Sequence, residues 1–275
     1  QAQLQADRNR AYYAKNRELH RSVVLRLTEQ IRNCILVHQQ PNARVARSGN
    51  LDPERVWRAP LLDDARVFRC AEEENQPSFT VDLLLDASAS RLHCQEVIAA
   101  QGSILAESLA VCGIPVRVSC FSSLRGYTVL RVLKGFQDKN LQNINQYFAS
   151  GWNRDGLALR AAGDLVDFAP GPAPRHLLIL LTDASPNDSR RVPPSPEQPL
   201  GCDYGGSYGV DDAAAEVRTL QRKGLRVSSV FMGEDSSSHD AERIYGKNLA
   251  RIRGMDQLAR AAGRLIQNEI RELGD

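Results

Sequence analysis

Three segments of the sequence carry oxygen-bearing side chains in patterns that suit a divalent cation. The first is a D-x-S-x-S motif that starts at Asp86, the second is GWNRDG at 151–156, and the third is the Thr-Asp pair at 182–183. Carboxylate, hydroxyl and amide oxygens are hard ligands, which Mg²⁺ and Mn²⁺ prefer. The candidate metal ligands are Asp86, Ser88, Ser90, Asn153, Asp155 and Asp183.

Each segment also has an ordinary structural interpretation. Asp and Ser are frequent at helix N-termini, so a D-x-S-x-S motif can simply cap a helix. A Thr-Asp pair after an apolar strand is a weak signal when taken alone. The occurrence of all three segments in one chain favours a metal site. Because hydroxyls are mixed with only a few carboxylates, the charge of the cation would not be fully neutralised, and the cation could accept an acidic group from a partner as a further ligand.

The elements before these segments must bring them together. Residues 79–86 and 175–182 are apolar runs of strand length, and the second is typical of a strand buried on both faces. Further strands are predicted at 115–121, 127–134 and 225–231, and helices near 91–112, 141–149, 156–168, 211–223 and 255–273. This alternation predicts an α/β fold with a doubly wound, mostly parallel central sheet and one antiparallel edge strand at 127–134. Ligands bind beyond the carboxyl ends of the strands in such sheets, where the three segments lie.

The N-terminal part of the chain has a different pattern. Leu19, Val23, Leu27 and Ile31 recur every four positions and predict a long helix over 4–38 with one apolar face. Residues 41–78 are predicted to be irregular. We therefore expect a helical and irregular N-terminal extension over 1–75 and an α/β domain over 76–275.

Composition and charge exclude several classes of protein. The chain has 275 residues, of which 42% are apolar, but no run of about 18 apolar residues that could form a transmembrane segment. Residues 1–70 carry 13 basic and seven acidic side chains, yet no interleaved aromatic and basic residues predict nucleic-acid binding. The six cysteines form no C-x-x-C pair, and no hydrophobic signal region precedes them, so we expect a cytoplasmic protein. Since the sequence lacks an initiator Met and begins within a helical pattern, we expect a piece of a longer chain.

The D-x-S-x-S motif, a second loop and a strand-terminal Asp together resemble the metal-ion-dependent adhesion site of the von Willebrand factor A family. This resemblance covers about residues 79–273. Four segments are similar to the NorD and CobT branch of that family: SGNLDPERVWR, GWNRDGLALR, LTDASPND and YGGSYGVDDAAAEVRTLQRKGL. The RIYGKNLARI segment near the end is also similar to the NorD type. Because SGNLDPERVWR starts at residue 48, the similarity extends back to about that residue. The resemblance implies that 76–275 is a von Willebrand factor A domain.

The resemblance implies a set of partners. NorD-like proteins are nitric oxide reductase activation proteins that work beside MoxR-type AAA+ ATPases, and CobT-like proteins serve metal chelatases. The implied partners are therefore a MoxR-type AAA+ ATPase and a metalloenzyme client, and the implied cofactor is Mg²⁺ or Mn²⁺. We also expect the helix over 4–38 to pack on the domain or to belong to a region that contacts the ATPase.

The resemblance also implies a role for each candidate ligand. Ser88 and Ser90 match the hydroxyl ligands, whereas Asp86 and Asp183 match acidic positions that usually reach the metal through water. The Thr of the family's second loop corresponds to Asn153 here. NorD- and CobT-like sequences commonly have Asn there and Asp two residues later, so either Asn153 or Asp155 is implied as the ligand.

The sequence departs from the family's pattern at one further place, directly after the predicted strand at 175–182. The usual T-D-G-x-P motif has Ala184 in place of Gly. A backbone conformation with positive φ is less comfortable for Ala than for Gly, so we expect some strain in this loop. Arg125 and Arg154 are candidates to place positive charge at the same edge of the sheet.

We expect a binding module and not an enzyme. The chain has no Walker A motif, so ATP hydrolysis has to come from a partner. No evident motif supplies a His–Asp relay that would make Ser88 or Ser90 a nucleophile. Three alternatives remain, namely a chelatase-like subunit of the CobT type, an extracellular adhesion domain, and a Mg²⁺-dependent hydrolase that uses Asp86. Phosphatases with an aspartate nucleophile need a second acidic residue where this chain has Ser88.

Overall fold

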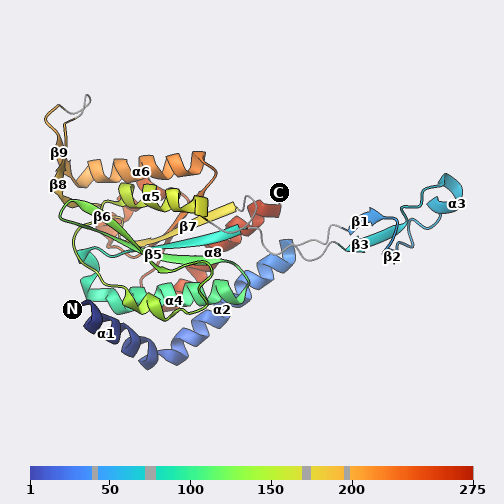
Figure 1. The fold of residues 1–275 in the computed structure, drawn as a ribbon, viewed down its shortest axis with the longest axis horizontal. Helices are drawn as coiled ribbons and strands as arrows, with labels where there is room; N and C mark the ends of the chain where they lie inside the picture. The colour runs from blue at the N-terminus through green and yellow to red at the C-terminus, as the bar shows by residue number, and fades with distance from the viewer. Residues whose placement is uncertain (39–42, 72–78, 169–174, 195–198, 275) are drawn as a thin grey trace.

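The computed structural model describes residues 1–38, 43–71, 79–168, 175–194 and 199–274. A six-stranded sheet with the order β11-β10-β7-β4-β5-β6 lies at its centre (Figure 1). All neighbouring strands are parallel except β5 and β6, which form an antiparallel hairpin at the edge. The strands are β4 (Phe79–Asp86), β5 (Val116–Leu124), β6 (Tyr127–Lys134), β7 (Arg175–Thr182), β10 (Arg226–Phe231) and β11 (Leu249–Arg251). The predicted fold class is therefore confirmed.

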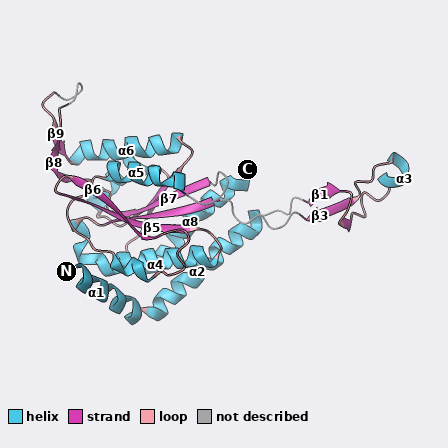
Figure 2. Ribbon diagram, in the orientation of Figure 1, coloured by secondary structure: helices cyan, strands magenta, loops and turns pink. Residues whose placement is uncertain are grey.

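Helices cover both faces of the sheet, as the ribbon in Figure 2 shows. One face packs on α5 (Asp155–Asp164), α6 (Gly206–Arg222) and α7 (Ser238–Tyr245), and the other packs on α4 (Gln95–Val111) and α8 (Met255–Gly274). Because β4 and β7 lie between these two layers, their apolar runs are buried on both faces. Removing this apolar surface from water stabilises the arrangement that holds the loops at the strand ends.

The predicted helix over 4–38 is two helices, α1 (Ala2–Lys15) and α2 (Arg17–His38), which meet at an angle at Asn16 (Figure 1). No Pro or Gly causes the bend. Tertiary packing explains it, because α1 contacts α4 and the segment before the second loop, whereas α2 packs on α4 and α8. His20 is buried at the bend against the rings of Tyr12 and Tyr13.

The apolar face of α2 belongs to the same hydrophobic core as α4 and α8. Val23, Leu27 and Ile31 are buried there as predicted, but Leu19 is 48% exposed, so the stripe begins one turn later than the sequence indicates. The proposed division of the chain near residue 75 stays a prediction.

Residues 41–78 were expected to be irregular, and the described part of them is not. A small antiparallel sheet with the strand order β1-β3-β2 lies there, and Figure 1 shows it to the right of the main body. Its strands are β1 (Ala43–Ala46), β2 (Asn50–Leu51) and β3 (Phe68–Ala71). The short helix α3 (Arg58–Leu62) lies between β2 and β3. These strands are too short for the alternation of polar and apolar residues to reveal them.

The remaining differences from the predicted elements are local. The helix predicted at 141–149 is a short 3₁₀ helix, η2 (Gln142–Gln146), and the loop at 184–210 contains the hairpin β8 (Asp188–Val192) and β9 (Cys202–Tyr204). Helix α7 and strand β11 were not predicted. Among the described residues, none of the helices combines the length and apolar character required to cross a membrane.

Candidate metal site

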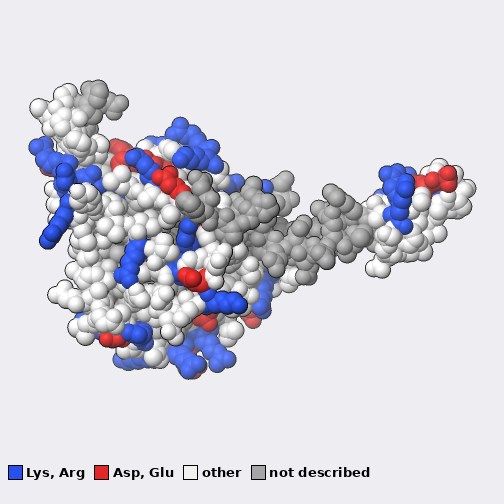
Figure 3. Space-filling view, viewed as in Figure 1, with Lys and Arg blue, Asp and Glu red and all other residues white. Residues whose placement is uncertain are grey.

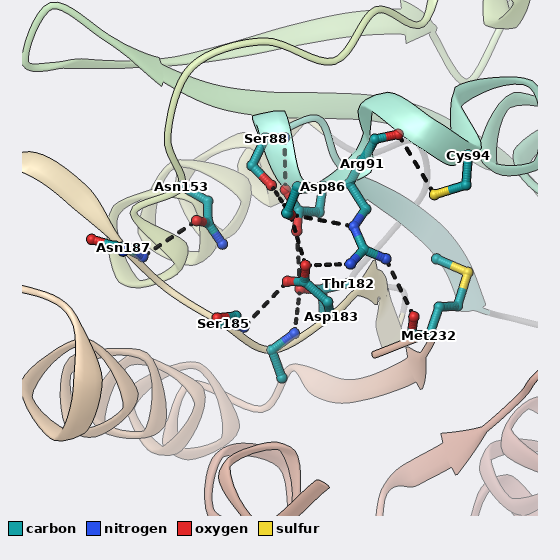
Figure 4. Close-up of polar contacts among 12 residues, drawn as sticks. Asp86, Ser88, Arg91, Cys94, Asn153, Thr182, Asp183, Ser185, Asn187 and Met232 are labelled. Carbon is teal, nitrogen blue, oxygen red and sulfur yellow. Dashed lines mark hydrogen bonds and ion pairs between the residues drawn. The ribbon is translucent and has the colours of Figure 1, made fainter. Parts of the chain in front are cut away.

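The three predicted segments meet at the carboxyl ends of β4 and β7, which are adjacent strands (Figure 4). Asp86 is the last residue of β4, and the loop after it leads into the 3₁₀ helix η1 (Ala89–Cys94). Thr182 ends β7 and Asp183 follows it. The second loop approaches from the side, where residues 151–154 lead into the first turn of α5.

Asp86 is fully buried, and both of its carboxylate oxygens accept hydrogen bonds. One carboxylate oxygen, Oδ1, accepts the backbone N–H of Ser88 at 2.9 Å, and the other accepts the Thr182 hydroxyl at 3.3 Å. The backbone carbonyl of Asp86 accepts a hydrogen bond of 2.5 Å from the hydroxyl of Tyr147, which is itself buried. These contacts fix the direction in which the carboxylate faces.

The two serine hydroxyls of the motif lie side by side. The Oγ atoms of Ser88 and Ser90 are 2.9 Å apart, and Ser90 donates a hydrogen bond of 2.7 Å to Oδ2 of Asp183. Arg91 forms an ion pair with the same carboxylate oxygen, and it donates a second hydrogen bond to the carbonyl of Met232 at 3.3 Å. This buried ion pair ties the first loop to the end of β7.

The second loop brings Asn153 and Asp155 to the same edge of the sheet as Asp86 and Asp183. Asn153 exchanges two backbone hydrogen bonds of 2.9 Å with Asn187, which follows β7. Its side-chain amide donates to Oδ1 of Asp155 at 3.1 Å. The other carboxylate oxygen of Asp155 is buried and has no hydrogen-bond partner in the part of the chain that the structure describes. A buried carboxylate oxygen without a partner is costly, so it marks a place where a cation would be stabilising.

The charges of the site are unbalanced. Three buried carboxylates, from Asp86, Asp155 and Asp183, face one buried guanidinium, from Arg91. Burial, and then the charge of Asp183, raises the pKa of Asp86 to about 6. Burial, followed by the charges of Asp86 and Asp183, raises the pKa of Asp155 well above its usual range. With all three ionised, negative charges exceed positive charges by the amount that one divalent cation supplies.

The donor set fits a hard cation. Within the described ranges, no three His, Cys, Asp or Glu side chains are arranged to hold a metal by themselves, so a metal site here would also need other oxygen donors, such as the serine hydroxyls or the Asn153 amide. All six predicted residues lie together, although which of them are ligands stays a prediction. Arg91 and Tyr147 were not predicted. The position of Arg91 directly after the motif is a signal that sequence reasoning could have used, whereas nothing in the sequence marks Tyr147.

The loop after β7 has the expected strain. Ala184 has a φ of 53°, in the region that favours glycine, and is fully buried. Its N–H donates to the Thr182 hydroxyl oxygen at 3.0 Å, and the N–H of Ser185 donates to Oδ1 of Asp183 at 3.3 Å. The positive φ lets the chain turn so that these donors face the site.

The two candidate arginines differ in their surroundings. Arg154 is ion-paired with Asp188 at 2.6 Å and stacks on the ring of Tyr204, with its guanidinium carbon 4.7 Å from the ring centre. Arg125 is exposed in the β5–β6 turn, where its φ is 51°.

Solved structures of other proteins share the fold of this chain. The pilus adhesin SpaC from Lactobacillus rhamnosus GG, in its open conformation, superposes with a TM-score of 0.51 at 14% identity, covering 74% of this chain and 30% of that chain. The vWF domain of the type V pili tip protein Mfa5 from Porphyromonas gingivalis has a TM-score of 0.46 at 11% identity, covering 71% of this chain and 94% of that chain. With this sheet order the chain has a fold of the von Willebrand factor A type, and it carries the D-x-S-x-S motif directly after β4.

Curated proteins that are similar in sequence give a more specific comparison. Protein NorD of Stutzerimonas stutzeri is 32% identical over 127 residues, which are 44% of this chain and 18% of that protein. Protein NorD of Brucella suis biovar 1 (strain 1330) is 26% identical over 141 residues, which are 50% of this chain and 20% of that protein. No protein-family model matches the chain. The chain is thus related to NorD, and the matched part spans about a fifth of the length of these relatives.

Proposed function

We propose that this chain is a non-catalytic protein-binding module that uses a divalent cation, Mg²⁺ or Mn²⁺, to bind an acidic group of a partner. The observation that carries the proposal is the buried Oδ2 of Asp155, which has no hydrogen-bond partner among the described residues. It lies in a cluster whose three carboxylates, when ionised, exceed the charge of Arg91 by two. A hard divalent cation would satisfy both the oxygen and the charge.

The proposal gives a separate role to each group of residues in the site. The hydroxyls of Ser88 and Ser90, with Asn153 or Asp155, would hold the ion, and the carboxylates of Asp86 and Asp183 would surround it. The bound cation would offer a coordination position to a carboxylate from outside. Tyr147 and Thr182 orient Asp86, and Arg91 orients Asp183.

The similarity to NorD supports a wider proposal. We infer that this module acts with a MoxR-type AAA+ ATPase to activate or assemble a metalloenzyme, and that nitric oxide reductase is the first client to test. The sequence has no Walker A motif, so the partner would supply ATP hydrolysis. The module itself would supply recognition of the client.

Calorimetric titration of Mg²⁺ and Mn²⁺ into the wild type and into Asp155→Asn tests the metal site. The variant should lose binding by at least about tenfold, because metal affinity depends on the charge of the ligands. Asp164→Asn is the matched control, since this exposed residue lies at the other end of α5. If the wild type binds neither cation, or if both variants bind equally, the metal site is wrong.

Affinity capture from a lysate of source cells in Mg²⁺ tests the partners. Wild type and Asp86→Ala are compared side by side by mass spectrometry. Retention of an AAA+ ATPase or a metalloenzyme by the wild type alone supports metal-dependent binding, and a captured chelatase would instead favour the CobT-like alternative. Equal retention by both proteins would contradict a role for the cation in binding.

A further inference from the structure

Three surface segments meet beside the candidate metal site. Trp152 exchanges two backbone hydrogen bonds, of 2.7 and 2.9 Å, with Ser123 at the end of β5. The next residue, Asn153, is paired in the same way with Asn187, just before β8. The β5–β6 turn contacts β8 as well, because a Cβ added to Gly126 would lie 2.5 Å from Cδ of Arg190. The turn, the second loop and β8 therefore form one continuous border next to Asn153.

Arginines from all three segments lie on this border. Two of them are already paired, since Arg154 contacts Asp188 and Arg191 contacts Asp203 at 3.0 Å. Arg125 and Arg190 are exposed, and in the part of the chain that the structure describes neither has an acidic side chain within ion-pair distance. Basic side chains gather at this end of the molecule, at the left of Figure 3 below the β8–β9 hairpin.

The position of Arg190 is set by its neighbours. Its backbone carbonyl accepts a hydrogen bond of 2.6 Å from the guanidinium of Arg154, and its backbone N–H donates to Asp188 at 3.1 Å. Arg154 is in turn held by Asp188 and Tyr204. The backbone below the exposed guanidinium is therefore fixed, which reduces the entropy that is lost when a ligand binds it.

An aromatic side chain adds apolar surface to the border. Trp152 is 44% exposed and directly precedes Asn153. Trp and Arg are enriched among the residues that contribute most to protein–protein affinity. Arg125, Trp152 and Arg190 thus combine charge, donors and apolar area at one rim of the site, which we name the basic rim.

We propose that the basic rim is a second contact surface for the partner and that it binds an acidic peptide segment. This inference rests on the proposed function. The cation would take one carboxylate of the segment, and neighbouring Asp or Glu side chains would meet Arg125 and Arg190. Uncompensated charge at the rim of an interface mainly accelerates association and makes it depend on salt concentration.

Association kinetics with a labelled peptide of alternating Glu and Gly residues test this proposal in Mg²⁺. The test variant is Arg125→Glu with Arg190→Glu. The matched control is Arg21→Glu with Arg26→Glu, which places the same charge change on the exposed face of α2. The rim variant should associate about tenfold more slowly at low ionic strength, and the difference should shrink at high ionic strength. The control should behave like the wild type.

Several outcomes separate this inference from the proposed function. If the rim variant binds as fast as the wild type while binding still requires Mg²⁺, the rim proposal is wrong and the metal-dependent function stands. If the rim variant is slow but binding is the same without Mg²⁺, the rim stands and the proposed function fails. Stronger binding of a DNA duplex than of the acidic peptide would overturn the choice of partner. If the Glu variant does not fold, Arg125→Gln with Arg190→Gln replaces it, with the same expected direction.

Discussion

The side-chain amide of Asn9, in the first helix, donates a hydrogen bond of 2.9 Å to the backbone carbonyl of Tyr147, 138 residues further along the chain. The same amide group also donates to the carbonyl of Asn145 at 2.8 Å. Because the hydroxyl of Tyr147 donates to the backbone of Asp86, two hydrogen bonds connect α1 to the candidate metal site. The helix therefore braces a part of the site that lies far from it in sequence.

Replacing Asn9 with Ala should weaken this brace. Two buried carbonyls would lose a donor, which costs about 1–3 kcal/mol of unfolding free energy in total. We also expect weaker Mg²⁺ binding, since Tyr147 would hold Asp86 less firmly. Chemical denaturation and calorimetric titration measure the two effects. Arg8→Ala, on the exposed face of α1, serves as the control. Unchanged Mg²⁺ affinity in a destabilised Asn9→Ala would show that the brace acts on the fold alone.

Replacing Asp155 with Asn should have opposite effects on stability and on metal binding. The new amide replaces a carboxyl whose ionised form is disfavoured by burial and by the neighbouring carboxylates, and it can donate to one of them. The metal-free protein should therefore gain about 1–3 kcal/mol, the usual cost of a buried polar atom without a partner. Thermal melts with a chelator and with Mg²⁺ measure both effects. Lower stability of the metal-free variant would mean that Asp155 is held by interactions other than a cation.

The stability of the metal-free protein should depend on pH through Asp86. Its folded pKa of about 6 lies above the ordinary value of 3.8, so folding favours the protonated carboxyl. The resulting stabilisation is complete below about pH 4 and is lost as the pH rises through about 6. Mg²⁺ should act in the opposite direction, because it binds the ionised form and stabilises more as the pH rises. Melting curves across this range, with and without Mg²⁺, measure both trends, and Asp86→Asn should reduce both.

Replacing Arg91 with Gln should increase the excess of negative charge in the site. The variant leaves the carboxylate of Asp183 buried without its cationic partner. Breaking a buried ion pair in this way typically costs about 3–5 kcal/mol. Because a divalent cation would compensate part of the charge, Mg²⁺ should raise the melting temperature of the variant more than that of the wild type. Arg10→Gln breaks an exposed pair with Asp7 and should change little. An equal effect of Mg²⁺ on variant and wild type would argue against a cation next to Asp183.

The central strands and the candidate ligands could be predicted because their signals are local. The apolar runs of β4 and β7 have the length of strands, and the D-x-S-x-S motif is visible in residue types alone. The position of both segments at one edge then follows from the rule for parallel sheets. The sequence alone therefore indicates that the six candidate residues lie at one edge of the sheet, and their role as ligands stays a prediction.

The contributions of Arg91 and Tyr147 could not be predicted in the same way. Arg91 acts on Asp183, 92 positions away, and Tyr147 acts on Asp86, 61 positions away. Such contacts depend on how the loops are oriented, and periodicity carries no information about this. The bend at Asn16 is similar, because no Pro or Gly marks it in the sequence and the packing partners of α1 and α2 decide its angle.

The packing of α2 on α8 has a consequence for the newly made chain. Cys34 in α2 contacts the backbone carbonyl of Gln267 in α8, 233 residues later. At a synthesis rate of about 5–20 residues per second, the ribosome makes the apolar stripe of α2 about 10–50 s before the helix that covers it. During that interval Leu27 and Ile31 lack the part of their final cover that α8 supplies, so apolar surface of α2 stays accessible to water until the last helix is made.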